Sequence, residues 1–190
     1  GEWITERQPS HWTQWGLDRD DIGRLFWIDN SNPLKSVQLH PKDWDVARKR
    51  LTKSIAGDLV NTGSPYAADF MQVKSLCLLN DRGGAASEVR AFTSACGQSI
   101  YRGQKMPFAD QGRYFFVDPT IHVVRRANVE DQDGKIFLTK AESRDGEFLR
   151  SSDINCRFVH TASGPDGAIY VTDMYRGIIQ DAPWLSPGPR

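Results

Sequence analysis

Residues 112–118 read Gly112-Arg-Tyr-Phe115-Phe-Val-Asp118, a turn glycine followed by an apolar run that ends at an acidic residue. The same pattern, Gly-x-x-[Phe/Tyr]-x-x-Asp, recurs at residues 23–29 and 167–173. The glycine permits the positive φ of a tight turn, the aromatic and β-branched run is typical of a strand packed on both faces, and the aspartate ends that strand. One such unit per blade is what a β-propeller needs, so the pattern predicts repeated antiparallel blades.

The spacing of the three units predicts an insertion between the first and the second. Their glycines, at positions 23, 112 and 167, are 89 and 55 residues apart, and a blade takes roughly 40–50 residues. From Asp43 onward, a helix N-cap is followed by apolar residues at helical spacing, and Gly57 is a helix stop. Residues 57–87 are rich in small and polar residues and predict a long loop.

Short strand patterns then follow one another from residue 88 onward, separated by turn sequences such as 131–134 and 164–167. A β-sandwich fits this number of strands nearly as well, but it gives no reason for one unit to recur at blade-length intervals. We therefore predict an all-β, partial β-propeller with about three blades and one short helical insertion. The expected organisation is a blade segment at 1–42, the insertion at 43–87, two blades at 88–180 and a tail at 181–190, with residues 113–117 and 168–172 as buried inner strands.

Composition and charge restrict the classes of partner. The 24 basic and 24 acidic residues balance, and no long run of one sign occurs, so nucleic acid is not an expected partner. No stretch approaches the roughly 18 apolar residues of a membrane span, and the first residues carry neither the basic nor the apolar part of a signal peptide. The cysteines at 77, 96 and 156 have no zinc or haem spacing, which leaves one disulfide or buried free thiols as alternatives.

Several segments carry a resemblance to a known family. They are residues 15–26, 30–34, 92–103, 114–119, 122–126, 147–153 and 164–180, the last of which ends in Tyr-Arg-Gly-Ile-Ile-Gln. In this order they resemble the C-terminal blades of the membrane-bound dehydrogenase propellers of planctomycete-type bacteria, distant relatives of soluble glucose and sorbosone dehydrogenases. The resemblance implies an exported, periplasmic six-bladed propeller.

In the sugar dehydrogenase relatives, pyrroloquinoline quinone (PQQ) lies over the central channel and accepts hydride from a sugar hydroxyl, while a His acts as base and calcium polarises the quinone. That His belongs to an earlier blade, so the resemblance names no catalytic residue in this sequence. Arg157 matches one of two quinone-binding arginines, whereas Val159 stands at the second position. The cofactor-binding candidates are Arg157, His122 and Arg176.

Propeller ligands sit at the channel ends of the inner strands, so the residues that follow each repeated strand are the candidates for binding a sugar or polyol. These are Asp29, Asn30, Asn32, Asp118, Asp173 and Tyr175. The aspartates have an alternative role, in which they cap turns by accepting backbone N–H bonds. The acidic residues at 18, 20 and 21 lack the glutamate of a calcium loop, and no metal site is predicted from them.

Three functions therefore stay open. The first is a segment of a sugar or alcohol dehydrogenase-like propeller, incomplete for catalysis by itself. The second is a non-catalytic propeller that binds carbohydrate or protein, and the third is a calcium-dependent, lactonase-like hydrolase. Because a partial propeller leaves blade faces uncovered, we also expect exposed rings near Phe26, Trp27 and Tyr170, and association with further blades or with a second copy.

Overall fold

The computed structural model describes residues 15–37, 67, 69–74, 89–90, 92–132, 135–142 and 146–177. Within these ranges the chain forms twelve strands and one short 3-10 turn, Phe108–Asp110. The strands are β1 (Leu17–Arg19), β2 (Leu25–Asp29), β3 (Asn32–Val37), β4 (Val73–Lys74), β5 (Val89–Arg90), β6 (Cys96–Ile100), β7 (Tyr114–Asp118), β8 (Val123–Gln132), β9 (Lys135–Lys140), β10 (Leu149–Arg150), β11 (Phe158–Ser163) and β12 (Ile169–Asp173). The fold is all-β, as the sequence predicts, and the predicted helix after Asp43 lies outside the described residues.

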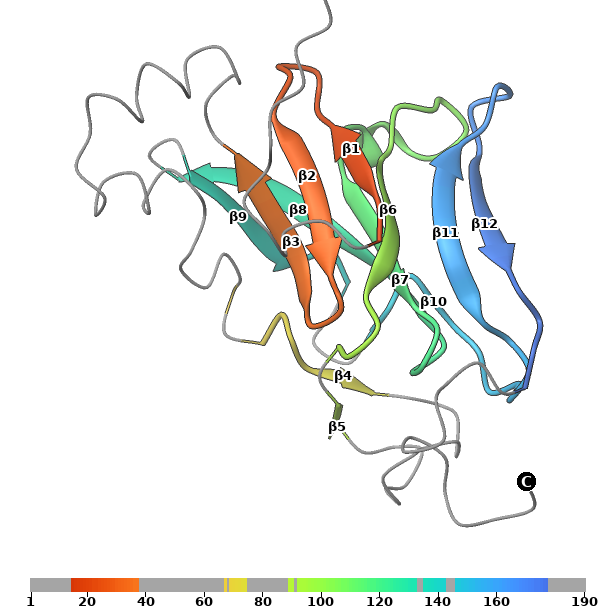
Figure 1. Cartoon of the computed structure of the whole chain (residues 1–190). Coiled ribbons are helices and arrows are strands. Elements are labelled where there is room, and N and C mark those ends of the chain that lie inside the picture. The colour runs from red at the N-terminus through yellow and green to blue at the C-terminus, as the bar shows by residue number, and fades with distance from the viewer. Residues whose placement is uncertain are drawn as a thin grey trace, which may run out of the picture.

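The strands form four antiparallel sheets (Figure 1). The first has the order β1-β2-β3, and the largest has the order β10-β8-β7-β6 with β9 also paired to β8. The other two are the pairs β11-β12 and β4-β5. Every pairing between these strands is antiparallel, which confirms the expected sheet type.

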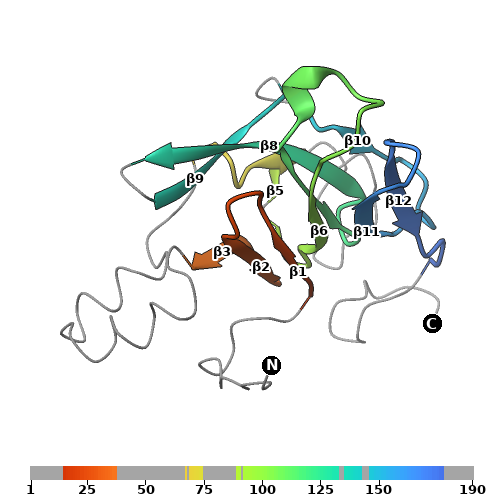
Figure 2. The same ribbon diagram turned by 90° about the horizontal axis from the view of Figure 1, so that it is seen from above.

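The three repeated units form three hairpins of the same design. Gly23, Gly112 and Gly167 have φ values of 88°, 74° and 83°, so each glycine adopts the left-handed turn conformation that the sequence predicts. The strand after each glycine pairs with the strand before it, giving the hairpins β1-β2, β6-β7 and β11-β12. Seen from above, β1, β6 and β11 follow one another across the molecule (Figure 2).

The hairpins pack against one another through their first strands. The backbone N–H of Gly97 in β6 donates to the carbonyl of Trp15 just before β1, and the Thr161 hydroxyl of β11 donates to the carbonyl of Gly97. A β-carbon at Gly97 would lie 2.3 Å from the carbonyl oxygen of Val159, so only glycine allows β6 and β11 to approach this closely. First strands that meet side by side are the arrangement of neighbouring propeller blades, and the fold is therefore partial and propeller-like.

The core consists of two clusters on opposite faces of β7. Tyr114 and Phe116 face the first cluster, and Phe115 and Val117 face the second. Every residue of β7 is buried, which confirms that this unit is a strand covered on both faces. The first cluster also receives side chains from the first sheet, from Ala67 and from residues 69–73, and the second lies between the largest sheet and the β11-β12 hairpin.

Residues 69–74, within the predicted loop, contribute to the core. Phe70 and Val73 are buried, and Val73–Lys74 forms β4. Arg125 of β8 holds this segment in place: its guanidinium donates to the carbonyls of Phe70 and Gln72 and forms a buried ion pair with Glu147. A loop prediction from composition could not detect a two-residue strand whose partner, β5, lies 15 residues further on.

Two further expectations are wrong. The segment 168–172 was predicted to be a buried inner strand, but β12 is partly to largely exposed, because in the described residues it pairs only with β11 and lies at the edge of the hairpin. Phe26 and Trp27 were expected to be exposed, but both are buried, since Phe26 packs in the first cluster with Tyr114 at a ring-centroid distance of 5.7 Å. Tyr170 is 56% exposed, as expected.

Candidate functional site

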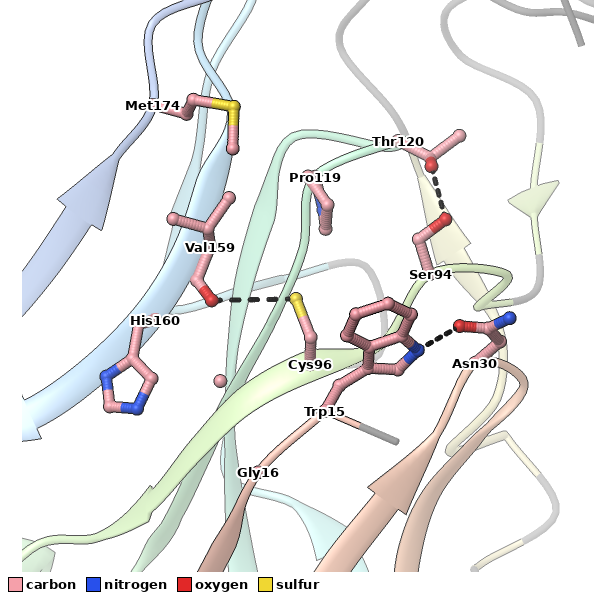
Figure 3. A pocket seen from close by; sticks show the side chains of 11 residues that line it. Trp15, Gly16, Asn30, Ser94, Cys96, Pro119, Thr120, Val159, His160 and Met174 are labelled. Carbon is pink, nitrogen blue, oxygen red and sulfur yellow. Dashed lines mark hydrogen bonds between the residues drawn. The ribbon is translucent and has the colours of Figure 1, made fainter. Parts of the chain in front are cut away.

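A cavity of about 670 Å³ lies where the repeated strands β2, β7 and β12 end and their hairpin partners begin (Figure 3). Asn30 directly follows β2, Pro119 and Thr120 follow β7, and Met174 follows β12. The remaining wall comes from the first strands and their approaches, namely Trp15, Gly16, Ser94, Cys96, Gly97, Val159 and His160. All three hairpins therefore contribute to one site.

Trp15 is a fixed aromatic surface at this cavity. Its side chain is exposed although the ring lines the cavity, and the indole Nε1 donates to Oδ1 of Asn30. Its backbone carbonyl accepts a hydrogen bond of 3.0 Å from Gly97. Because both ends of the residue are held, the ring presents a pre-oriented apolar face, shown beside Asn30 and Cys96 in Figure 3.

Polar groups occupy two parts of the rim. The hydroxyls of Ser94 and Thr120 lie 2.6 Å apart, and one of them donates to the other. A hydroxyl has one proton and two lone pairs, so this pair keeps a donor and acceptor capacity for a ligand. The exposed His160 side chain lies on β11. Val159 and Met174 form an apolar wall across from the hydroxyls, and Pro119 lies between this wall and Thr120 (Figure 3).

Cys96 lines the cavity as a neutral thiol. Burial raises its pKa to about 12, with a further contribution from the Asp118 carboxylate, and the thiol lies 3.6 Å from the carbonyl oxygen of Val159. Nucleophilic attack and metal binding both require the thiolate. Cys96 is therefore an apolar wall residue at neutral pH. Both described cysteines, Cys96 and Cys156, are free thiols.

Asp118 directly precedes two residues of the cavity wall, Pro119 and Thr120. Its buried carboxylate accepts four backbone N–H bonds, two at Oδ2 from Thr93 and Ser94, and two at Oδ1 from Thr120 and Ile121. Burial raises the pKa of this carboxyl, and the four hydrogen bonds oppose that rise. The aspartate is thus a cap that positions Ser94 and Thr120, which is the alternative role that the sequence left open.

Asp173 has the same capping role in the third hairpin. It accepts backbone N–H bonds from Arg157 at 2.6 Å and from Tyr175 at 2.8 Å. Burial acts to raise the pKa of this carboxyl, but the other interactions of the carboxylate, led by the two backbone hydrogen bonds and followed by one with the Cys156 thiol, together lower the pKa. Tyr175 has a φ of 46°, and its hydroxyl donates to Asp153 at 3.1 Å, outside the cavity wall.

Arg157, the residue that matches a quinone-binding arginine, is a buried structural link. Its guanidinium donates to the carbonyls of Pro119, Arg176 and Gly177, and Nη1 also lies 2.9 Å from Nε2 of His122. His122 is buried with a φ of 58°, and burial together with the Arg157 charge lowers its pKa to about 4. These two residues connect the segments that follow β7 and β12.

The other sequence candidates lie apart from the cavity. Asn32 is exposed at the start of β3, opposite Asp29 in the hairpin register, and Arg176 is exposed beyond β12. The side chain of Asp29 is outside the described part of the chain. Of the eight candidates whose side chains the structure describes, only Asn30 lines the cavity. Trp15 and Cys96 were not predicted from the sequence. Each directly precedes a glycine, Gly16 or Gly97, and this glycine is the signal that could have indicated them. Both glycines have a positive φ and lie near the start of the first strand of a hairpin.

The described residues do not fit the implied cofactors. The carboxylates of PQQ need cationic donors that face the ligand, whereas the donors of Arg157 are directed at backbone carbonyls and His122 is neutral and buried. Calcium needs a group of convergent carboxylate and carbonyl oxygens. Within the described ranges there is no group of three or more His, Cys, Asp or Glu side chains that could hold a metal ion.

Fold and site together define an all-β, propeller-like protein with a cavity at one end of three similar hairpins. Residues 4–189 match the model of a family described as a domain of unknown function, DUF7133, and the chain belongs to that family. No curated protein and no solved structure matches the chain. None of the helices in the described residues is long and apolar enough to cross a membrane.

Proposed function

We propose that this chain is a carbohydrate-binding part of a propeller, with its ligand in the cavity beside Trp15. The observation that carries the proposal is the half-exposed indole, held by Asn30 and facing an open cavity of about 670 Å³. Sugar rings have an apolar C–H face and a polar rim of hydroxyls. An aromatic ring with amide and hydroxyl groups around it complements both surfaces.

The cavity lining is mostly apolar, and the polar groups at its rim suit the hydroxyls of a sugar whose C–H face lies against the apolar wall. Ser94, Thr120 and His160 lie around the cavity and offer donors and acceptors without a fixed net charge nearby. Pockets that hold small ligands usually have volumes of about 300–1,000 Å³ and a few polar groups that set orientation, and this cavity agrees with both features.

A binding role accounts for the described residues better than quinone-dependent oxidation. The resemblance to exported sugar dehydrogenase propellers supports a sugar as ligand and a periplasmic location. However, the matching arginine, Arg157, uses its donors on backbone carbonyls, and its neighbour His122 is neutral. We therefore favour the non-catalytic alternative over the dehydrogenase and the calcium-dependent hydrolase.

The test is binding of a panel of neutral saccharides, first on an array and then by calorimetry, to the wild-type chain, Trp15→Ala and Phe108→Ala. Phe108 is an exposed ring away from the cavity and serves as the matched control. Loss of an aromatic anchor at the centre of a site costs about 2 kcal/mol or more, so W15A is expected to raise Kd more than about tenfold. Absence of any saccharide binding, or equal Kd values for W15A and wild type, would contradict the proposal.

A further inference from the structure

A second cavity of about 320 Å³ adjoins the first. It is lined by Leu17, Asp18, Gln98, Ser99, Ile100, Arg102, His160, Thr161, Ala162 and Ser163. His160 belongs to the walls of both cavities. The wall residues come from β1, β6 and β11 and from Arg102, two residues after β6, so the second cavity is built from the same first strands as the first.

The two cavities are consecutive along all three strands. On the first hairpin, Gly16 lines one cavity and Leu17 lines the next; on the second hairpin, Gly97 and Gln98 do the same. On β11, His160 lines both cavities. Along β6, from Cys96 to Ile100, the combined walls extend for up to about 13 Å, at roughly 3.3 Å per strand residue. This length exceeds a single sugar ring.

The two charged side chains that line the second cavity, Asp18 and Arg102, have opposite signs. Arg102 lies 3.8 Å from Asp18 and 2.7 Å from Asp21. Asp18 also accepts the backbone N–H of Ile100 at 2.6 Å, so its carboxylate is well satisfied. The uncharged polar groups are three hydroxyls, the Gln98 amide and the His160 imidazole. Ser99 and Thr161 lie 2.8 Å apart, and Ser163 accepts the backbone N–H of Arg102. A ligand along this groove meets hydroxyl groups and compensated charges.

We infer that the ligand is an uncharged oligosaccharide that lies along β1, β6 and β11, with one unit on Trp15 and further units past His160 in the second cavity. This inference rests on the proposed function of the Trp15 cavity and names its ligand class. Ala162, an exposed small residue on β11, leaves room in the second cavity for the further units.

The experiment measures Kd by calorimetry for glucose, cellobiose and cellohexaose, with the matching malto- and xylo-series. We expect the affinity of the wild-type chain to rise at least about tenfold from the monosaccharide to the hexasaccharide of the binding series. In Ala162→Phe the new ring fills the second cavity, and phenylalanine is well tolerated in a strand. The increase in affinity with the length of the saccharide is expected to disappear in this variant. Gln132→Phe, at the exposed end of β8 and away from both cavities, is the matched control and keeps the gain.

The outcomes separate the inference from the proposed function. Equal affinity for short and long saccharides, or an unchanged length dependence in A162F, overturns the extended ligand and leaves the Trp15 site standing. Tighter binding of oligogalacturonate than of every neutral series overturns the uncharged ligand. If no saccharide binds but a proline-rich peptide binds and W15A abolishes that binding, both the inference and the proposed function are overturned.

Discussion

Arg157 and His122 form a buried pair in which Nη1 of the arginine lies 2.9 Å from Nε2 of the histidine. Because a guanidinium can only donate, Nε2 must accept, and the imidazole must be neutral. Arg157 also donates to carbonyls after β7 and β12. Arg157 therefore connects the second and third hairpins, and its contact with His122 requires that His122 carries no charge.

The stability of the protein is expected to fall between about pH 6.5 and pH 4. In the unfolded chain a histidine takes up a proton near pH 6.5, whereas burial and Arg157 lower the pKa of folded His122 to about 4. The unfolded state thus binds more protons in this window, and the free energy of unfolding decreases as the pH falls, by about 2–3 kcal/mol from this group.

Urea denaturation at pH 7.5 and pH 4.5 measures this dependence. His122→Asn tolerates the positive φ and removes the titrating group. The free energy of unfolding of this variant is therefore expected to fall much less between pH 7.5 and pH 4.5 than that of the wild type. His160→Asn, at an exposed histidine, is the matched control and should show the same decrease in the free energy of unfolding as the wild type. An H122N variant with the same pH dependence as the wild type would show that another group is responsible.

Asp118→Asn is expected to lower the free energy of unfolding by about 2–4 kcal/mol, because an amide NH2 would face two backbone N–H groups that now donate to a carboxylate oxygen. Asp166→Asn, at an exposed aspartate that accepts a single N–H from Ala168, is the control and should change stability by less than about 1 kcal/mol. Urea denaturation measures both. Equal effects of the two substitutions would mean that the four hydrogen bonds of Asp118 stabilise the protein no more than the single hydrogen bond of Asp166.

The parts of the fold that were predicted correctly depend on local sequence. A glycine before an apolar run determines a turn within a few residues, so the hairpins at Gly23, Gly112 and Gly167 could be recognised. The burial of a strand depends on what packs against it. The units that contain β7 and β12 have the same pattern, yet one is fully buried and the other lies at an edge.

The site was harder to predict because it joins residues from three distant segments. Trp15, Cys96 and His160 meet only through the packing of β1, β6 and β11, and no spacing in the sequence indicates that packing. The rule that ligands lie after the repeated strands does lead to Asn30. The resemblance indicated Arg157 as a ligand residue, whereas its donors are used on main-chain carbonyls, a pairing that sequence alone does not reveal.

The chain is not expected to reduce an artificial electron acceptor with glucose when PQQ and calcium are supplied. The donors of Arg157 are committed to carbonyls, and the described residues contain no cluster that could hold calcium. A dye-reduction assay measures turnover, and an absorbance titration measures quinone binding independently of turnover. A soluble quinoprotein glucose dehydrogenase is the positive control. Saturable turnover would refute the non-catalytic assignment.

Gly97→Ala is expected to destabilise the protein much more than Gly112→Ala, although both glycines have a positive φ, of 58° and 74°. A β-carbon in the left-handed conformation costs roughly 1–2 kcal/mol at either position. At Gly112 nothing lies within 4 Å of the added carbon. At Gly97 the carbon would lie 2.3 Å from the Val159 carbonyl oxygen and 2.4 Å from Cα of His160, so β6 and β11 would have to separate.

Both variants carry the backbone strain of a β-carbon at positive φ, but only G97A also disturbs the close approach of β6 and β11. The difference between their free energies of unfolding therefore measures the effect of that close approach. We expect urea denaturation to show a loss of about 1–2 kcal/mol for G112A and at least about 2 kcal/mol more for G97A, since overpacking adds roughly 1–3 kcal/mol. Separation of the strands would also displace Val159 and His160 from the cavity wall, so G97A should weaken saccharide binding while G112A does not. Equal losses of stability in the two variants would mean that β6 and β11 are not in contact at Gly97, and the propeller-like packing of the hairpins would be wrong.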